Sequence, residues 1–446
     1  MITGITKEII RERVQNAGIV GAGGAGFPTY VKFNSEAEIF LVNGAECEPL
    51  LKVDQQLAEK NAIELIKGLQ YGMIATGAKE GIIALKAKYK TAIETLTPLL
   101  PHDIRIHILD DVYPAGDEVI TIWMATGRRV PPAALPLSVG VVVNNVQTLI
   151  NVSHAVENEA PVIDKTLTIN GMVKTPITVT VPIGTTYRQV LEMAGGATIP
   201  NPAFLNGGPM MGVLFHDLDE PIKKTTGALL VLPDDHLLIR RRTQNMNSVV
   251  AMARTVCEQC CLCTELCPRH LIGHELPPHL IVRAVNYQKA DQTECSTILS
   301  ALTCSECGIC EAYACPVEIS PMRLNQALKA QFRAEGAKYT GELRPLNPMA
   351  EYRMLPISRL ITRIDLDRMN HKAPMINIDW MPSKVVLPLL QHIGAPAKPV
   401  VAVGDRVTRG QLIAAMDAGK LGVPLHASIS GIIQNIDDHN IVIAQE

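Results

Sequence analysis

Three observations predict a multidomain α/β protein. The chain has 446 residues, and at roughly 100–200 residues per domain about three domains are expected. Short apolar runs alternate with amphipathic stretches over residues 1–155, which is typical of a parallel sheet covered by helices. Ten of the eleven cysteines lie between Cys257 and Cys315, a concentration that favours reduced, metal-holding thiols in a cytosolic compartment over a disulfide framework.

Composition excludes several functional classes. The net charge is -3 and aromatic residues make up 4% of the chain, so neither a basic surface nor stacking side chains indicate nucleic-acid binding. No apolar run approaches the roughly 18 residues of a membrane-spanning helix, so no membrane insertion is expected. Residues 1–13 alternate charged and apolar residues without the hydrophobic stretch of a signal peptide. Together these features favour a cytoplasmic protein.

The first domain is expected over residues 1–155. Its predicted helices and strands follow in chain order: helix 5–16, strand 39–43, helix 55–75, strand 80–86, helix 88–97, strand 104–110 and strand 139–146. The stretch 39–43 (IFLVN) is a short apolar run bounded by turn residues, as expected for a buried strand. A loop of Gly and Ala separates the first helix from the first strand.

The rest of the chain is expected to form four further segments. Residues 160–236 alternate Thr, Val and Ile, which predicts a β-rich domain with a hairpin at Asn170-Gly171 and one helix near 186–194. Three segments follow: 245–335 with the cysteines and helical stretches, 336–384 as a helical linker, and 385–446 as strands between Gly-rich turns.

The cysteine spacing predicts two iron–sulfur clusters. One run reads Cys-x2-Cys-x2-Cys-x3-Cys-Pro and the next Cys-x2-Cys-x2-Cys-x4-Cys-Pro, close to the bacterial pattern for [4Fe–4S] clusters. The fourth cysteine of such a run ligates the other cluster. The expected ligand sets are therefore Cys257, Cys260 and Cys263 with Cys315, and Cys304, Cys307 and Cys310 with Cys267.

Zinc is the alternative for paired Cys-x2-Cys units. A third cysteine at the same spacing and the terminal Cys-Pro of each run favour clusters instead. Cys261 and Cys295 fit neither run, and we expect them to be buried thiols near the clusters.

The loop Gly21–Gly26 satisfies the pattern G-x-G-x-x-G, but a helix precedes it where a dinucleotide-binding fold requires a strand. Consecutive glycines let backbone N–H groups line a concavity for phosphate, and Pro28 is acceptable in the first turn of a helix. Lys32 lies one turn further and reaches the same region. The residues alone leave two interpretations open: a phosphate cradle or a tight turn.

Several segments, in chain order, resemble the FMN- and NADH-binding subunit of respiratory complex I. GAGGAGFPTYVKF (21–33) is similar to its flavin-phosphate loop, and NGAECEP (43–49) to its second flavin segment. YPAGDE (113–118) and NNVQT (144–148) resemble the third and fourth. The resemblance implies a Rossmann-like flavin-binding domain, a bound FMN, and NADH as electron donor.

The resemblance also implies roles for individual residues. The phosphate would be held by Gly21, Gly23, Gly24, Gly26 and Lys32. The ribityl chain and ring would be contacted by Asn43, Glu46 and Glu48. Tyr113, Gly116, Asp117 and Glu118 would lie near the ring and the nicotinamide, while Asn144, Asn145 and Thr148 would close the site. The acidic residues Glu46, Glu48, Asp117 and Glu118 are expected to be catalytic.

Two positions depart from the family pattern. Ala45 stands where the complex I subunit has an acid, and Ala22 where it usually has a base. Both departures concern the binding of NADH more than the binding of FMN.

Later segments resemble domains of related electron-transfer proteins. GGPMMG (207–212) with KKTTGALLVLP (223–233) is similar to a β-grasp (SLBB-type) domain, followed by the ferredoxin-like two-cluster segment. Residues 392–414 with 423–431 resemble the barrel-sandwich hybrid domain of the Rnf electron-transport C subunit, where that domain is N-terminal. Its C-terminal place here resembles the corrinoid (cobalamin) reductases of propanediol-utilisation microcompartments.

That resemblance implies an NADH-dependent reductase whose electron acceptor is cobalamin. It also implies an adenosyltransferase and microcompartment shell proteins as partners, and a location in the microcompartment lumen. Two alternatives stay open: an electron-input subunit of a membrane ferredoxin:NAD oxidoreductase, like the Rnf C subunit, and an electron-relay module with no substrate site.

The remaining chemical side chains favour structural roles. Cys47 lies between two glutamates that disfavour its thiolate, so we expect it to pack. Lys420 lacks the sequence context of a lipoyl lysine and is expected to be unmodified. Hydrogen-bonded or surface roles are expected for His236, His270, His274, His279 and His426. Residues 357–369 are basic, and a solvated helix face is favoured over a partner-docking helix.

Overall fold

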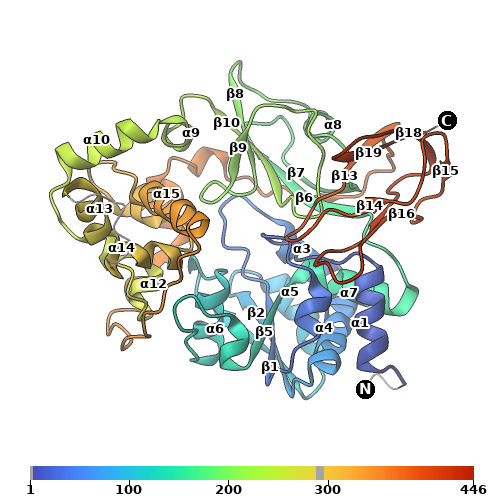
Figure 1. The fold of residues 1–446 in the computed structure, drawn as a ribbon, viewed down its shortest axis with the longest axis horizontal. Helices are drawn as coiled ribbons and strands as arrows, with labels where there is room; N and C mark the ends of the chain where they lie inside the picture. Colours follow the sequence, from blue (N-terminus) through green and yellow to red (C-terminus); the bar gives the residue numbers. More distant parts are fainter. Residues whose placement is uncertain (1–3, 288–295, 446) are drawn as a thin grey trace.

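The computed structural model describes residues 4–287 and 296–445. Cys295 lies outside the described residues. Figure 1 shows the N-terminal domain in blue and teal, a green β domain beside it, the cysteine segment in yellow and orange, and the C-terminal β domain in red. The predicted multidomain α/β class is confirmed.

The sheet of the N-terminal domain is parallel and runs in the order β3-β2-β1-β5. Its strands are β1 (Ile39–Asn43), β2 (Glu80–Lys86), β3 (Ile104–Leu109) and β5 (Val141–Asn145). Alternate residues of β1 belong to two different cores: Phe40 and Val42 to one, Ile39 and Leu41 to the other. The first core is shared with α1 (Lys7–Asn16), α4 (Ala62–Thr76) and α7 (Val146–Asn158), and the second with α6 (Glu118–Thr126). Burial of both faces explains the apolar runs of the central strands β1 and β2, whereas the edge strand β3 carries the exposed Arg105.

One predicted helix differs from the structure. The stretch 55–75 forms two helices, α3 (Val53–Lys60) and α4, because the backbone leaves helical conformation at Asn61 with φ -120° and ψ 41°. The break lets Leu57 and Leu65 enter the same core from different directions. The other short elements here are α2 (Thr29–Phe33), α5 (Lys90–Leu96), η1 (Thr97–Leu99), β4 (Val112–Tyr113) and η2 (Pro136–Val139).

The second domain is built on a mixed sheet in the order β12-β7-β6-β10-β8-β9. Its elements are β6 (Asp164–Gly171), β7 (Ile177–Pro182), α8 (Tyr187–Met193), β8 (Pro202–Asn206), β9 (Val213–Phe215), β10 (Ala228–Pro233) and β12 (Met375–Ile376). Helix α8 confirms the prediction near 186–194 and begins with a capping box between Thr186 and Gln189.

The hairpin predicted at Asn170-Gly171 forms with a longer connection. Strands β6 and β7 are antiparallel neighbours, but Ile169 pairs with Ile177, so the dipeptide ends β6 instead of forming a two-residue turn. Gly171 has another role: its φ is +90°, and a Cβ there would lie 2.3 Å from the Val231 carbonyl oxygen of β10. Glycine is needed because two backbones approach closely.

The cysteine segment is helical, as predicted. Its elements are α9 (Leu237–Thr243), α10 (Met246–Val256), α11 (Leu262–Glu265), α12 (Pro268–Leu271), α13 (Pro278–Tyr287), α14 (Ser296–Leu299), η3 (Ser300–Thr303), the π-turn η4 (Cys310–Ala314) and α15 (Pro321–Ala334). Pro268 occupies the first position of α12, where a missing N–H costs nothing.

The segment interpreted as a linker returns across both earlier domains. Its elements are β11 (Leu355–Pro356), α16 (Ile357–Arg363), η5 (Asp367–Met369) and β12. Strand β11 pairs with β4 of the N-terminal domain, and β12 pairs with β7 of the second domain. These pairings make the segment a strap between domains.

The C-terminal domain is β-rich, as predicted. One sheet has the order β13-β19-β18-β15 and another β14-β16-β17. The strands are β13 (Lys384–Pro388), β14 (Lys398–Pro399), β15 (Arg406–Val407), β16 (Leu412–Ala415), β17 (Leu425–His426), β18 (Gly431–Ile436) and β19 (Asn440–Ala444). Among the described residues, the helices all fall short of the length and apolar character needed to span a bilayer.

Candidate flavin and iron–sulfur site

The carboxyl ends of β1 and β5 place three predicted flavin residues together. These strands are neighbours, with Val42 opposite Asn144 and Asn43 opposite Asn145. Strands β2 and β3 lie on one side of β1 and β5 lies on the other, so the order of the sheet switches here. Open parallel sheets bind ligands outside the carboxyl ends at such a switch. Asn43 also donates to the Gly116 carbonyl over 2.8 Å, which brings in the third predicted segment.

The glycine loop lies at this edge and is held from two sides. The Ala22 N–H donates to Thr148 Oγ1 over 3.0 Å, so the predicted fourth segment anchors the loop directly. Lys165, from the second domain, donates to the Ala22 carbonyl over 2.9 Å. Gly24 is exposed, and a Cβ on it would meet no atom within 4 Å. The loop therefore presents open backbone at its tip while its stem is fixed.

Lys32 and Glu118 meet across the site. Lys32 Nζ lies 3.2 Å from Glu118 Oε1 and donates to the Val143 carbonyl of β5 over 2.8 Å. Glu118 is the first residue of α6, where a carboxylate interacts favourably with the helix dipole. The sequence placed both residues at the site but did not predict their ion pair.

A buried acidic pair lies beneath the loop. Glu46 Oε1 accepts from the Val53 N–H over 2.5 Å, and Asp54 accepts from Asn145 Nδ2 over 2.7 Å. Burial raises the pKa of both carboxyls, and burial together with the neighbouring Glu46 raises that of Asp54 to about 8. Burial lowers the pKa of Lys165 to about 8, and Asp54 opposes that shift.

Asp54 and Lys165 were not singled out from the sequence. Asp54 follows the motif NGAECEP by five residues, in the first turn of α3. This closeness to the motif in the sequence was the one signal that could have identified Asp54. Lys165 belongs to another domain and gave no local signal.

Three buried polar atoms at this site have no hydrogen-bond partner among the described residues: Thr29 Oγ1, Glu46 Oε2 and Asn144 Nδ2. Buried polar groups are nearly always paired, so each orphan atom indicates a missing partner. A flavin offers donors and acceptors along its ring and ribityl chain, and its phosphate suits the open backbone at Gly24. The residues present therefore fit FMN.

Three other predicted flavin residues lie at the junction with the second domain and the cysteine segment. Glu48 accepts from the Met210 and Met211 N–H groups over 2.9 and 3.0 Å. Tyr113 donates to the Cys307 carbonyl over 2.7 Å. Asp117 caps α6 and pairs with Arg269 at 2.8 Å. Burial raises the pKa of Glu48 to about 7, against the two N–H donors that lower it. Cys47 packs against Gly116 at the same junction, in agreement with the packing role predicted for it.

The second cysteine run surrounds a cavity together with one cysteine of the first. Cys267, Cys304, Cys307 and Cys310 all line it. No group of three His, Cys, Asp or Glu side chains in the described residues is arranged for a single metal ion. Thiols around a cavity suit a polynuclear cluster, which is larger than one ion.

Cysteines of the first run likewise lie near the fourth cysteine of the second run. Burial, together with the nearby Cys260 and Cys315, raises the pKa of Cys263 to about 12. Cys267 in turn raises the pKa of Cys307. These neighbours agree with the expected ligand sets, which stay a prediction.

The two cysteine runs have the same left-handed backbone conformation at two matching positions, and Cys261 occupies one of them. Gln259 and Cys261 have φ of 54° and 64°, and the matching positions of the second run, Glu306 and Gly308, have 59° and 78°. Cys261 therefore occupies the left-handed position that the second run fills with glycine. Its side chain is half-buried, so the expected full burial is not observed.

Three of the five histidines expected to be hydrogen-bonded or surface residues have protein partners, whereas His426 is buried and its Nδ1 has no partner among the described residues, as is also true of His270 Nδ1. His274 bonds to the Val130 carbonyl over 2.9 Å, His279 to Thr264 over 2.6 Å, and His236 to the Asp365 carbonyl over 3.3 Å. Lys420 pairs with Asp417 at 3.3 Å.

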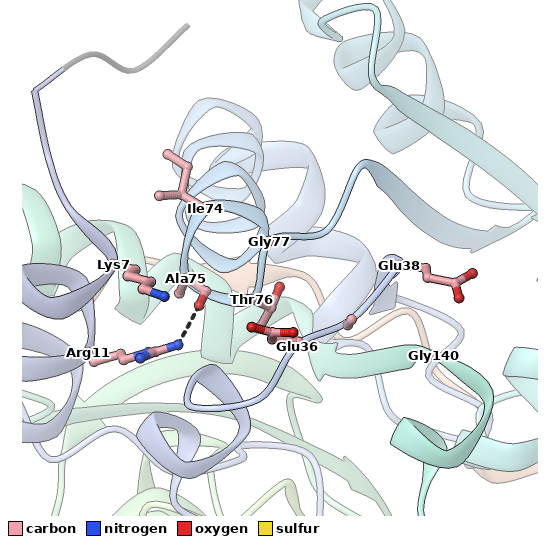
Figure 2. A pocket seen from close by; sticks show the side chains of 10 residues that line it. Lys7, Arg11, Glu36, Glu38, Ile74, Ala75, Thr76, Gly77 and Gly140 are labelled. Atoms are coloured by element: carbon pink, nitrogen blue, oxygen red, sulfur yellow. Dashed lines mark hydrogen bonds between the residues drawn. The ribbon is translucent and has the colours of Figure 1, made fainter.

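A surface pocket lies at the opposite edge of the sheet, near the amino ends of β1 and β5. Figure 2 shows Lys7 and Arg11 facing Glu36, Thr76 and the end of α4. Arg11 already donates to the Ala75 carbonyl over 2.9 Å. None of the predicted site residues lies in this pocket.

Four family models match separate parts of the chain. The Nuo51 FMN-binding domain model matches residues 14–154, and the SLBB domain model matches 166–214. The 4Fe-4S dicluster domain model matches 256–320, and the RnfC barrel sandwich hybrid domain model matches 366–446. The chain thus contains an FMN-binding domain and a 4Fe-4S dicluster domain.

Relatives and a solved structure resemble the chain over different shares of its length. The chain is 59% identical over 441 residues to "Cobalamin reductase PduS" of Salmonella typhimurium, covering 99% of this chain and 97% of the relative. It is 60% identical over 436 residues to the protein of that name from Citrobacter freundii, covering 98% and 96%. The C subunit of the Na(+)-translocating ferredoxin:NAD(+) oxidoreductase complex of Acetobacterium woodii is 34% identical, covering 59% and 58%. An NAD+-reducing [NiFe]-hydrogenase structure matches with a TM-score of 0.48 at 20% identity, covering 85% of this chain and 67% of that chain. The length and identity of the first two matches show that the chain belongs to the cobalamin reductase PduS family.

Proposed function

We propose that this protein is an NADH-dependent reductase of cobalamin. One NADH is oxidised to NAD+ and a proton, and its two electrons reduce two cob(III)alamin molecules to cob(II)alamin. FMN supplies the conversion of a hydride pair into single electrons, and two [4Fe–4S] clusters supply their transport. Family membership over nearly the whole chain carries this proposal.

The residues of the chain are assigned roles on the geometry above. Gly23 and Gly24, at the exposed tip of the loop, would hold the flavin phosphate with their backbone, and Lys32 adds positive charge next to Glu118. Gly21 and Gly26 support the loop instead: the Gly21 N–H donates to the Phe27 carbonyl over 3.0 Å, and Gly26 is buried. Asn144 and Glu46 use their unpartnered atoms on the flavin. Asn145 and Thr148 hold Asp54 and the glycine loop in place. Glu48, Tyr113 and Asp117 join this site to the cysteine segment and act as positioning residues.

The activity is tested on anaerobically purified protein. NADH is expected to bleach the flavin band and then to convert added cob(III)alamin to cob(II)alamin. If NADH bleaches nothing while dithionite still reduces the clusters, the protein is an electron-relay module. Co-purification with membrane subunits would favour a role like that of the Rnf C subunit.

The flavin site is tested by Gly24→Ala. The new methyl group meets no protein atom, so the fold is expected to survive, but the methyl occupies the space proposed for the phosphate. We expect at least a tenfold loss of bound FMN per chain, with unchanged iron content and circular dichroism. Gly227→Ala is the control, since its Cβ meets Leu51 at an ordinary 3.7 Å. Full FMN occupancy in Gly24→Ala would contradict the assignment.

The partners and location are proposed from the family alone. An adenosyltransferase would consume the reduced corrinoid, and shell proteins would enclose the reductase in a microcompartment lumen. Purified microcompartments should contain the protein protected from added protease until the shell is broken. Digestion at the same rate in intact and broken shells would place it outside.

A further inference from the structure

Two residues at the flavin site, Tyr113 and Met210, contact the second cysteine run directly. Tyr113, whose segment is tied to Asn43 through Gly116, donates its hydroxyl to the carbonyl of Cys307 over 2.7 Å. Met210, which Glu48 holds, lies against the next residue of the run: a Cβ on Gly308 would be 3.3 Å from Met210 Cε. These contacts end on the second run.

Cys267, the first-run cysteine in the same cavity, is tied to the flavin domain as well. It is followed by Pro268 and Arg269, and Arg269 pairs with Asp117 at 2.8 Å with both side chains 14% exposed. Buried ion pairs of this kind fix the relative position of the elements that carry them. All four thiols of the cavity therefore lie in segments that border the flavin domain.

The first run lies on the far side of these contacts. Cys257 and Cys315 pack with Val249, Val282 and Leu324 of α10, α13 and α15. Figure 1 shows α10 and α13 at the end of the molecule opposite the C-terminal domain. Cys260 is exposed, and beside it Leu262 is 42% exposed. Cys267, Cys307 and Cys310 are each less than one-tenth exposed, as is Cys315, and Cys304 is half-buried, so among these thiols the exposed position is that of Cys260.

We propose that electrons enter the cysteine segment at the cluster of Cys267, Cys304, Cys307 and Cys310 and leave the protein from the cluster of Cys257, Cys260, Cys263 and Cys315, at the surface around Cys260. The proposal rests on the proposed function only for the presence of the flavin and both clusters. With both clusters bound, the cysteines Cys267, Cys304, Cys307 and Cys310 would hold the cluster that receives each electron from the flavin, and Cys257, Cys260, Cys263 and Cys315 would hold the cluster that passes it to a one-electron acceptor at the protein surface. The order follows from contact, because electron transfer slows steeply with distance and the hydrogen bond of Tyr113 reaches the backbone of a cluster ligand.

The order is tested with one ligand variant in each run. In Cys260→Ala, NADH should still reduce the remaining cluster, seen by electron paramagnetic resonance, while acceptor reduction falls at least tenfold. In Cys307→Ala, NADH should bleach the flavin but leave the remaining cluster oxidised until dithionite is added. The reverse pattern would overturn the proposal. Iron analysis confirms that each variant keeps about four irons per chain, the content of one [4Fe–4S] cluster.

A second measurement needs no NADH. In the same variants reduced by dithionite, a soluble dysprosium complex should speed the relaxation of the cluster left in Cys307→Ala and leave the one in Cys260→Ala unchanged. Equal relaxation of both would refute the exposed outer cluster even if the enzyme is fully active. If NADH fails but this contrast holds, the proposed electron donor is wrong and the placement of the clusters stands.

Two further variants keep every cluster ligand. Tyr113→Phe removes only the hydroxyl and should slow cluster reduction by NADH several-fold without changing flavin bleaching or iron content. Leu262→Glu should slow acceptor reduction several-fold while NADH reduces both clusters normally. Leu137→Glu, equally exposed at 40% but in the flavin domain, is the control. Unchanged rates in both Tyr113→Phe and Leu262→Glu would contradict the proposed entry and exit.

Discussion

Lys224 carries an ammonium group that the fold buries without an ion pair. Its side chain donates to the Gly18 carbonyl over 2.7 Å and approaches the Pro424 carbonyl at 3.3 Å, so it joins the stem of the glycine loop to the C-terminal domain. The residue is 3% exposed, and burial lowers its pKa from 10.5 to about 7. Replacing it with Met keeps the length of the side chain and removes the charge.

The stability effect of Lys224 depends on pH with a definite sign. Between pH 7 and 10.5 the unfolded chain holds a proton that the folded chain has released, so the free energy of unfolding rises with pH. At about 1.4 kcal/mol per pH unit, and with the folded group half protonated at pH 7, this group adds about 2 kcal/mol of stability from pH 7 to pH 9. Lys224→Met is expected to lack this gain.

Urea unfolding at pH 7 and pH 9 measures the effect. Other buried groups also titrate in this range, so the relevant quantity is the difference between wild type and variant at each pH. That difference should move by about 2 kcal/mol in favour of the wild type at pH 9. Lys223→Met, at the neighbouring half-buried lysine, should leave the pH dependence unchanged. An identical wild-type-minus-variant difference at both pH values would refute the reasoning.

Further substitutions test other contacts by the same unfolding measurement. Cys261→Gly should stabilise the protein by about 1 kcal/mol, because glycine adopts the left-handed backbone at φ 64° without strain, while Cys261→Ala should not. Gly68→Ala should cost about 3 kcal/mol, since its Cβ would lie 1.9 Å from the Leu149 carbonyl and force α4 and α7 apart; a loss below 1 kcal/mol would contradict this close approach. Arg269→Met should cost about 3 kcal/mol by leaving Asp117 unpaired, and adding Asp117→Asn, which keeps the helix cap, should recover part of the loss. Strictly additive losses in that double variant would show that the pair is not coupled.

Most elements could be predicted from the sequence because their signals are local. The strands predicted at 39–43, 80–86, 104–110 and 139–146 are found with ends within about two residues of these bounds, whereas the two-residue β4 was not predicted. The break at Asn61 was missed, since both flanking helices carry apolar residues at helical spacing and Asn only weakly opposes a helix. The hairpin at Asn170-Gly171 was misplaced because the glycine serves contact with β10, a strand some sixty residues later.

The candidate site likewise combines residues that the sequence predicts with contacts that it does not predict. The candidate ligands and site residues could be predicted from the sequence, because each signal is local: cysteines separated by two to four residues, a run of glycines, and pairs of acids within short flavin segments. Which partners these side chains contact depends on the tertiary structure. Tyr113 meets Cys307, Glu48 meets Met210, and Lys165 meets Ala22 across 194, 162 and 143 residues. Such pairs carry no local pattern, because they form only when separate domains bury their surfaces against each other, and that packing turns a flavin motif and two cysteine runs into one ordered electron path.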